Sequence, residues 1–244
     1  SDPASGSFTV RDLKLPGGVD DSRFVKRRRI LDAVNDHFAA KEKADSLDAV
    51  DAFYSRAYNM ISSQKAREAF DITKETDATR DQYGRNTAGA RLLMARRLVE
   101  SGVRFVTLTY GGWDMHGNIA GGFRGSMPAF DQGFAALIND LESRGMLDST
   151  MIVVMSEFGR TPNINKYYGR DHWGNAWSIC LGGGKIARGA VVGKTNENGT
   201  KVIDREVSYP HLFHTYLAGV GLDSHEPFDV GGRPVPMADP AFGP

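Results

Sequence analysis

The sequence predicts an α/β fold with a parallel sheet in its carboxyl-terminal part, preceded by a helical segment. Two observations lead to this class. Apolar residues follow a helical period up to about residue 101, and the pattern then changes to strand, helix, strand over residues 103–155. That order is typical of a βαβ unit, whose right-handed crossover makes its two strands parallel. We therefore divide the chain into a mainly helical segment packed on the core (1–101), an α/β core (102–222) and an extended tail (223–244).

In the amino-terminal part, three groups of mostly apolar residues each share a helical face. They are Ile30, Leu31, Val34 and Phe38, then Leu47, Val50, Tyr54, Ala57 and Ile61, then Leu92, Leu93, Arg96 and Val99. Gly102 follows the third group and is a good helix stop. The charged residues of this part are expected to face solvent, so we interpret it as a helical layer without a site.

The core is expected to hold three strands and two helices. Residues 103–110, rich in β-branched and aromatic side chains, indicate a buried strand. A helix is expected to start with Ser126 as its N-cap and to end at Gly145. Further strands are predicted at 151–155 and 176–181, and a last helix at 208–220 with Pro210 near its start.

Composition excludes several classes of function. Lys plus Arg equals Asp plus Glu at 30 each, so the net charge gives no general attraction for nucleic acid. No apolar run approaches the roughly 20 residues that a membrane-spanning helix needs. The single cysteine, Cys180, has no partner for an internal disulfide and is expected to be buried in its apolar stretch.

Polar motifs flank each predicted strand. Asp114 and His116 follow the first strand, Glu157 and Arg160 follow the second, and 170–172 (Arg-Asp-His) precedes the third. Ligands of open α/β sheets bind beyond the carboxyl ends of the strands, so we expect these side chains to converge there.

An Asp-x-His motif in a turn suits a divalent cation such as zinc or manganese, which binds carboxylate oxygen and imidazole nitrogen. The alternative is a turn carboxylate beside a surface histidine. Glu157 ends an apolar strand, where a carboxylate is costly unless it is paired or ligated; its alternative role is an ion pair with Arg160. The alternative role of Asp171 is to orient its neighbour His172.

Two arginines accompany these motifs. Arg160 and Arg170 carry the planar guanidinium that binds phosphate or sulfate oxygens through two parallel hydrogen bonds, which makes them candidate catalytic residues. Each is equally explained as the structural partner of a neighbouring carboxylate, Glu157 or Asp171.

The segments GGWDMHGN, LDSTMIVVMSEFGRTP and GRDHW together resemble the bacterial family called domain of unknown function 1501, over most of the chain. That family is similar to a branch of the alkaline phosphatase and sulfatase superfamily. The resemblance implies an alkaline phosphatase-like parallel-sheet sandwich in the carboxyl-terminal part, and a periplasmic or exported protein.

The resemblance also implies a site and an activity. Asp114, His116 and His172 are expected to ligate one metal ion, with Asp171 beside them as a further metal-binding residue and Glu157 at a second metal position. The ion is expected to be zinc, manganese or calcium. The implied reaction is hydrolysis of phosphate or sulfate esters, including those of carbohydrates, with Arg160 or Arg170 holding the ester oxygens.

Two departures from the superfamily pattern matter. Phe158 stands where many relatives have a histidine of the second metal site, and the chain shows no amino-terminal strand bearing a nucleophile. We therefore expect a carboxyl-terminal piece that is catalytically incomplete without the missing amino-terminal half of the same protein. Two alternatives remain open: a non-catalytic metal- or anion-binding protein on a degenerate hydrolase fold, and a structural module without a metal.

Overall fold

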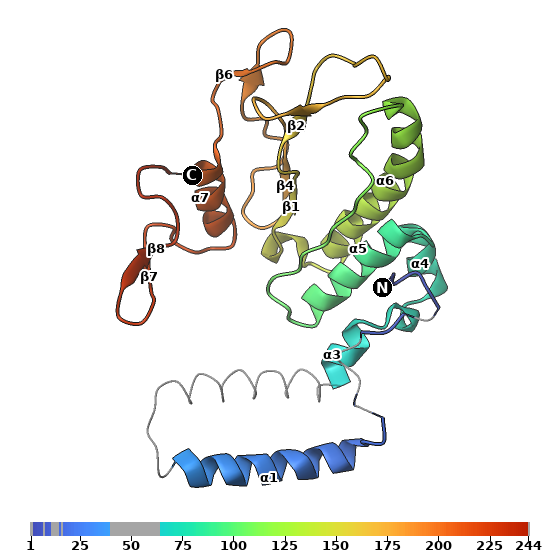
Figure 1. Cartoon of the computed structure of the whole chain (residues 1–244), viewed down its shortest axis with the longest axis vertical. Coiled ribbons are helices and arrows are strands. Elements are labelled where there is room, and N and C mark those ends of the chain that lie inside the picture. Colours follow the sequence, from blue (N-terminus) through green and yellow to red (C-terminus); the bar gives the residue numbers. More distant parts are fainter. Residues whose placement is uncertain (1, 7, 11–14, 16, 40–63, 244) are drawn as a thin grey trace. The chain divides into compact units, whose positions relative to one another are not determined.

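The computed structural model of the chain (Figure 1) describes residues 2–6, 8–10, 15, 17–39 and 64–243. The chain divides into two units, Ser1–Leu108 and Thr109–Pro244, which we describe one at a time. The division falls a few residues after the change of pattern in the sequence.

The described residues of the first unit form helices and no strand. They are α1 (Asp21–Ala39), α3 (Gln64–Ala69), the short 3₁₀ helix η2 (Ile72–Lys74), α4 (Asp77–Tyr83) and α5 (Thr87–Glu100). The apolar face predicted for α1 is largely open, because Ile30 and Val34 are exposed. The helix predicted around 47–61 lies outside the described residues.

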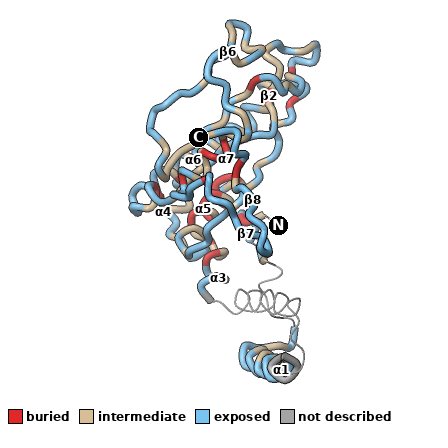
Figure 2. Tube along the Cα trace, turned by 90° about the vertical axis from the view of Figure 1, so that its left-hand side faces the viewer, coloured by how far each residue is buried: buried red, intermediate tan, exposed pale blue. Residues whose placement is uncertain are grey.

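Helix α5 supplies most of the buried side chains of this unit (Figure 2). The Asn86 side chain caps its start by accepting a hydrogen bond from the Gly89 amide at 3.0 Å. After its last residue, Gly102 adopts a φ of 98° and its amide donates to the Val99 carbonyl at 2.9 Å. The predicted helix end at Gly102 is therefore confirmed, and Leu92 of the predicted helical face is buried.

One charged residue of α5 is buried, contrary to the expectation that charges here face solvent. Arg96 is only 1% exposed. Its guanidinium forms ion pairs with Glu75 at 2.9 Å and with Glu100 at 2.6 Å. A buried cation is tolerated only when it is paired in this way, so the helical layer is organised around an ion cluster as well as apolar contacts.

The second unit contains two long helices, one short helix and eight short strands. They are α6 (Ile119–Ser143), η3 (Leu147–Ser149), β1 (Ile152–Val154), β2 (Gly159–Arg160), β3 (His172–Trp173), β4 (Cys180–Gly182), β5 (Lys194–Thr195), β6 (Val202–Asp204), α7 (Tyr209–Gly219), β7 (Pro227–Asp229) and β8 (Pro234–Pro236).

Helix α6 starts earlier than predicted. Asn118, not Ser126, is its N-cap, with a φ of 44° and a side chain that accepts a hydrogen bond from the Gly121 amide at 3.2 Å. The prediction failed because Pro128 resembles a first-turn proline, whereas it lies inside the helix. The carbonyl that loses its helical partner there belongs to exposed Arg124, so water can satisfy it. The predicted end at Gly145 is confirmed, with a φ of 67°.

The sheets differ from the predicted parallel arrangement. The described strands form four antiparallel pairs, β1 with β4, β2 with β3, β5 with β6 and β7 with β8. The parallel pair predicted from the βαβ pattern, 103–110 with 151–155, is not among them, because β1 pairs with β4 and 103–110 pairs with no described strand. The alkaline phosphatase-like sandwich stays a prediction.

The segment 103–110, expected to be a buried strand, pairs with no strand in the described part of the chain. Phe105 is 87% exposed. Its β-branched and aromatic composition gives it strand propensity, but propensity alone does not provide a hydrogen-bonding partner. Cys180 on β4 is exposed as well, so its predicted burial is wrong.

The last helix agrees with its prediction. Ser208 precedes α7 as its N-cap, and the Ser208 amide donates to His211 Nδ1 at 3.1 Å. In the segment expected to be an extended tail, β7 and β8 pair as a hairpin. Buried His214 of α7 contacts the Ser224 hydroxyl at 2.7 Å and the Asp239 carbonyl at 2.8 Å, which ties this segment to the helix. Among the helices described, none combines the length and apolar character needed to cross a membrane.

Candidate metal centre

Aromatic packing holds the segment before α6 against that helix. The Tyr110 ring stacks on Phe130 with centroids 6.0 Å apart, and its hydroxyl donates to the Ser126 carbonyl at 3.2 Å. Trp113 meets Phe123 edge-on at 5.6 Å. Because these contacts immediately precede the Asp-Met-His turn, they place that turn beside the first part of α6.

The β2–β3 pair supplies the other half of the site. Arg160 on β2 lies directly opposite His172 on β3 in the antiparallel register. Opposed residues of such a pair project their side chains to the same face. This short strand pair therefore places the Arg160 guanidinium and the His172 imidazole side by side.

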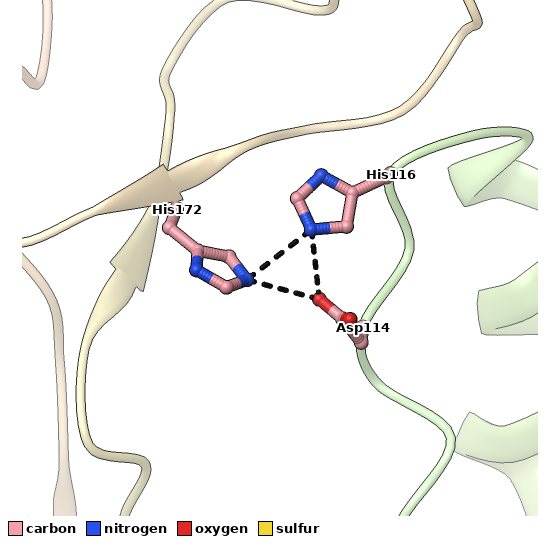
Figure 3. A group of neighbouring side chains, drawn as sticks. All are labelled: Asp114, His116 and His172. Atoms are coloured by element: carbon pink, nitrogen blue, oxygen red, sulfur yellow. Dashed lines mark hydrogen bonds and ion pairs between the residues drawn. The ribbon is translucent and has the colours of Figure 1, made fainter.

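Three side chains converge at this point (Figure 3). Asp114 Oδ1 lies 3.0 Å from His116 Nε2 and 3.1 Å from His172 Nε2. The two Nε2 atoms lie 3.2 Å apart. The three atoms thus form a nearly equilateral triangle, built from the turn before α6 and from β3. All three residues are exposed, so the site is open to solvent.

Asp171 orients one of these imidazoles from the far side of its ring. Its Oδ1 lies 2.8 Å from His116 Nδ1. Hydrogen bonds from His116 first and Asn165 second hold the pKa of Asp171 below its usual range. A carboxylate accepts a hydrogen bond from Nδ1 when that nitrogen carries the proton. Nε2 of the neutral ring is then unprotonated, and its lone pair is directed at the triangle. Asp171 was predicted to be a metal ligand, whereas the structure places its carboxylate on the far side of His116, outside the triangle.

Arg160 contacts the same carboxylate oxygen. Its Nη2 donates to Asp114 Oδ1 at 2.5 Å, and its Nη1 donates to the Arg170 carbonyl at 3.3 Å. The hydrogen bond from Arg160, followed by that from His172, lowers the pKa of Asp114 to about 2. Asp114 is therefore ionised over the whole physiological range, as a metal ligand must be. The ion pair of Arg160 runs to Asp114, not to Glu157 as the alternative interpretation expected.

The other predicted arginine holds a loop together. Arg170 Nη1 donates to the carbonyls of Thr161 and Pro162, at 2.6 and 2.5 Å. Its amide donates to the Met115 carbonyl at 3.0 Å. These bonds give Arg170 a role in positioning the 161–170 loop on the turn that carries His116.

Glu157 is placed apart from the triangle. Strand β1 ends at Val154, and Glu157 lies exposed in the loop that follows. The argument that its carboxylate is buried at a strand end is therefore wrong. Its backbone carbonyl accepts the Tyr209 hydroxyl at 2.8 Å, which links this loop to α7.

Sequence reasoning did not foresee two contacts of the site, one made by Phe158 and one made by Asn165. Phe158 packs its ring against His172 with centroids 4.3 Å apart. Asn165 bonds both the carboxylate of Asp171 and the carbonyl of His116. An asparagine before a glycine-containing turn was visible in the sequence, but it indicates a turn and no more.

The donor set fits a divalent cation. One carboxylate and two imidazoles are the usual ligands of zinc and manganese. Donor atoms bound to one such ion at about 2.0–2.2 Å lie roughly 3–3.5 Å from each other. The triangle edges of 3.0 to 3.2 Å meet this condition. In the part of the chain that the structure describes, this is the one group of acidic, histidine and cysteine residues so arranged.

The site thus defines a candidate metal-binding protein, and the sequence places it in a family. The family described as Protein of unknown function (DUF1501) matches residues 1–242, so the chain belongs to that family. No curated protein and no solved structure matches the chain.

Proposed function

We propose that this protein binds one divalent cation through Asp114, His116 and His172 and acts on phosphate or sulfate esters. The observation that carries the proposal is the triangle of Oδ1 and two Nε2 atoms, with Asp171 behind one imidazole and Arg160 on the carboxylate. A carboxylate, a histidine and a metal ion in this order is a recurrent arrangement in metal centres, because the outer carboxylate fixes the ring and raises its basicity.

The ligand types favour zinc or manganese over calcium. Calcium prefers six to eight oxygen ligands, whereas two of the three donors here are imidazole nitrogens. Three protein ligands leave coordination positions for water or substrate, as in catalytic zinc sites. The exposure of all three residues gives a substrate access to such positions.

Arg160 is the residue we assign to the anionic group of the substrate. Its guanidinium lies next to the triangle, and a planar fork of donors matches two oxygens of a phosphate or sulfate. When bound, the cation supplies Lewis-acid polarisation of the ester and stabilises charge on its oxygens. The protein residues hold the imidazoles and the carboxylate in place and orient the ester against them. Carbohydrate esters are one substrate class compatible with such an open site.

One observation favours a second candidate, a non-catalytic metal- or anion-binding protein. Ester hydrolysis in the resembling superfamily uses two cations, and Glu157, the residue expected at the second, lies outside the triangle. A single cation beside Arg160 is sufficient to bind an anion without turnover.

Metal analysis combined with a substrate screen separates these candidates. The purified protein is dialysed against zinc or manganese, its metal content is measured, and hydrolysis of aryl phosphates and aryl sulfates is followed. His172→Ala is the test variant. His225→Ala is its control, because His225 is an exposed histidine paired with Asp223 away from the triangle.

Each outcome decides between the candidates. One bound cation and turnover, both lost in His172→Ala and kept in His225→Ala, supports the hydrolase. One bound cation without turnover supports the binding protein. Wild-type protein that retains no cation refutes both.

A further inference from the structure

The side chain of Asn165 joins the two halves of the candidate metal centre. Its Nδ2 donates to the Asp171 carboxylate at 3.1 Å and to the His116 carbonyl at 3.0 Å. Its Oδ1 accepts the amides of Tyr167 at 2.9 Å and Gly169 at 3.0 Å. Both amide hydrogens and the carbonyl oxygen are therefore in use at once.

These partners fix the orientation of the amide group. Two backbone amides, which only donate, face one end of it, so that end must be the oxygen. The other end faces a carbonyl and a carboxylate, which only accept when the acid is ionised. A flipped amide would place donor against donor and acceptor against acceptor, so one arrangement is selected.

The backbone around Asn165 packs tightly on the segment that carries His116. A Cβ at Gly169 would lie 2.0 Å from the His116 carbonyl carbon. The backbone at Gly169 and the backbone at His116 are therefore in contact with no side chain between them. The amides of Asn118 and Ile119 donate to the carbonyls of Tyr167 and Tyr168, at 3.0 and 2.8 Å. The loop that contains Asn165 and Gly169 is therefore packed directly against the backbone that carries His116.

We propose that Asn165 is a positioning residue of the metal centre, which holds Asp171 against His116 Nδ1 and so presents His116 Nε2 to a cation. This inference rests on the proposed function, in which His116 Nε2 is a metal ligand. A single oxygen of Asp171, Oδ1, contacts both His116 Nδ1 and Asn165 Nδ2. The donor of Asn165 fixes where that oxygen lies, and the oxygen in turn selects the Nδ1–H form of the neutral imidazole.

The test compares Asn165→Ala with Asn163→Ala. Asn163 lies exposed in the same loop and receives the Thr161 hydroxyl at its backbone carbonyl, which the substitution keeps. The first measurement is the ¹⁵N chemical shift of the His116 ring nitrogens in metal-free protein at about pH 8, where free imidazole is neutral. The second is zinc affinity by calorimetry. Asp171→Ala is a further variant that keeps the contacts of Asn165 to the backbone but removes the acceptor for His116 Nδ1.

We expect His116 in the wild type and in Asn163→Ala to carry its proton on Nδ1. In Asn165→Ala the two tautomers should be mixed, and zinc affinity should fall by about 10- to 100-fold, the usual effect of losing an outer hydrogen-bond partner. Should Asn165→Ala not fold, Asp171→Ala is expected to show the same two changes, because it removes the oxygen that Asn165 holds against His116 Nδ1.

Two results overturn the proposal: an Nε2–H tautomer in the wild type, or an Asn165→Ala protein with wild-type tautomer and zinc affinity. Zinc affinity absent from the wild type refutes the proposed function instead, and the tautomer comparison then still decides whether Asn165 orients His116. The two failures are therefore distinguishable.

Discussion

Replacing Arg160 with methionine is expected to change the affinities for zinc and for an anion in opposite directions. Arg160 Nη2 lies 2.5 Å from Asp114 Oδ1, the oxygen that a cation would bind. The guanidinium and the cation compete for that oxygen, so removing Arg160 should tighten zinc binding. It should also weaken phosphate or sulfate binding to the zinc-loaded protein, because the fork of donors is lost.

The exposure of the Asp114 and Arg160 side chains decides how much the zinc affinity should change. The Asp114 side chain is 68% exposed and that of Arg160 is 26% exposed, so water screens their attraction. Exposed ion pairs change an equilibrium by about 1.5- to 5-fold, and the short contact favours the upper end of this range. We expect zinc to bind about 3- to 5-fold more tightly. Anion affinity should fall about 10-fold, as for one hydrogen bond to a charged group.

Calorimetry with zinc, and then with phosphate and sulfate on the zinc-loaded protein, measures both effects. Arg188→Met is the control, since Arg188 pairs with Glu142 and Asp148 elsewhere on the surface. Thermal unfolding checks that the variant keeps the fold, because Arg160 also donates to the Arg170 carbonyl. Zinc affinity that falls along with anion affinity would show that Arg160 only maintains the site, and would refute this reasoning.

Three further predictions concern residues that hold the site or the helical unit. Asp114→Asn should lower zinc affinity by more than about 100-fold, beyond the range for outer residues, and an unchanged calorimetric titration would exclude Asp114 as a ligand. Gly169→Ala places a Cβ against the His116 carbonyl, so it should lower the unfolding free energy by about 1–3 kcal/mol and weaken zinc binding; a variant equal to wild type in both contradicts the close packing. Glu75→Gln leaves Arg96 buried with half its counter-charge and should cost about 3 kcal/mol in guanidinium unfolding, whereas less than about 1 kcal/mol would contradict the burial. Burial by itself raises the pKa of Glu75, but hydrogen bonds from Arg96 and Arg97 outweigh it and lower the pKa. The stabilisation is therefore complete above the unfolded-state pKa of about 4.3 and is lost as the pH falls through the lower folded-state pKa. Unfolding curves of the wild type should therefore lose more stability between neutral and acid pH than those of Glu75→Gln.

Helix ends with a local chemical cause could be predicted from the sequence. Gly102 and Gly145 end α5 and α6 because a left-handed residue is needed there, and Ser208 begins α7 through hydrogen bonds with the His211 side chain three residues later. The direction of β1 relative to β4 has no local signal. It depends on how the long connection between them folds, and an apolar run such as 151–155 looks the same in a parallel and in an antiparallel pair.

The site was predictable to the extent that its residues lie in short motifs. Asp114, His116 and His172 have side chains suited to metal binding, and the structure brings all three together. Glu157 has suitable chemistry but lies elsewhere, since its position depends on where β1 ends. Asn165 was missed because its role exists only through contacts with His116 and Asp171, which are distant in sequence or on the other side of a turn.

The antiparallel pairing of β1 with β4 also bears on how the site opens. The two strands close a loop that contains Arg160, Asn165 and His172, so this loop is a candidate unit of local unfolding. Its connection to the turn bearing His116 includes side-chain contacts and backbone hydrogen bonds, such as that from the Arg170 amide to the Met115 carbonyl. Amide hydrogen exchange in 159–173 and 115–119 should therefore be correlated, and a bound cation should slow exchange in both segments together.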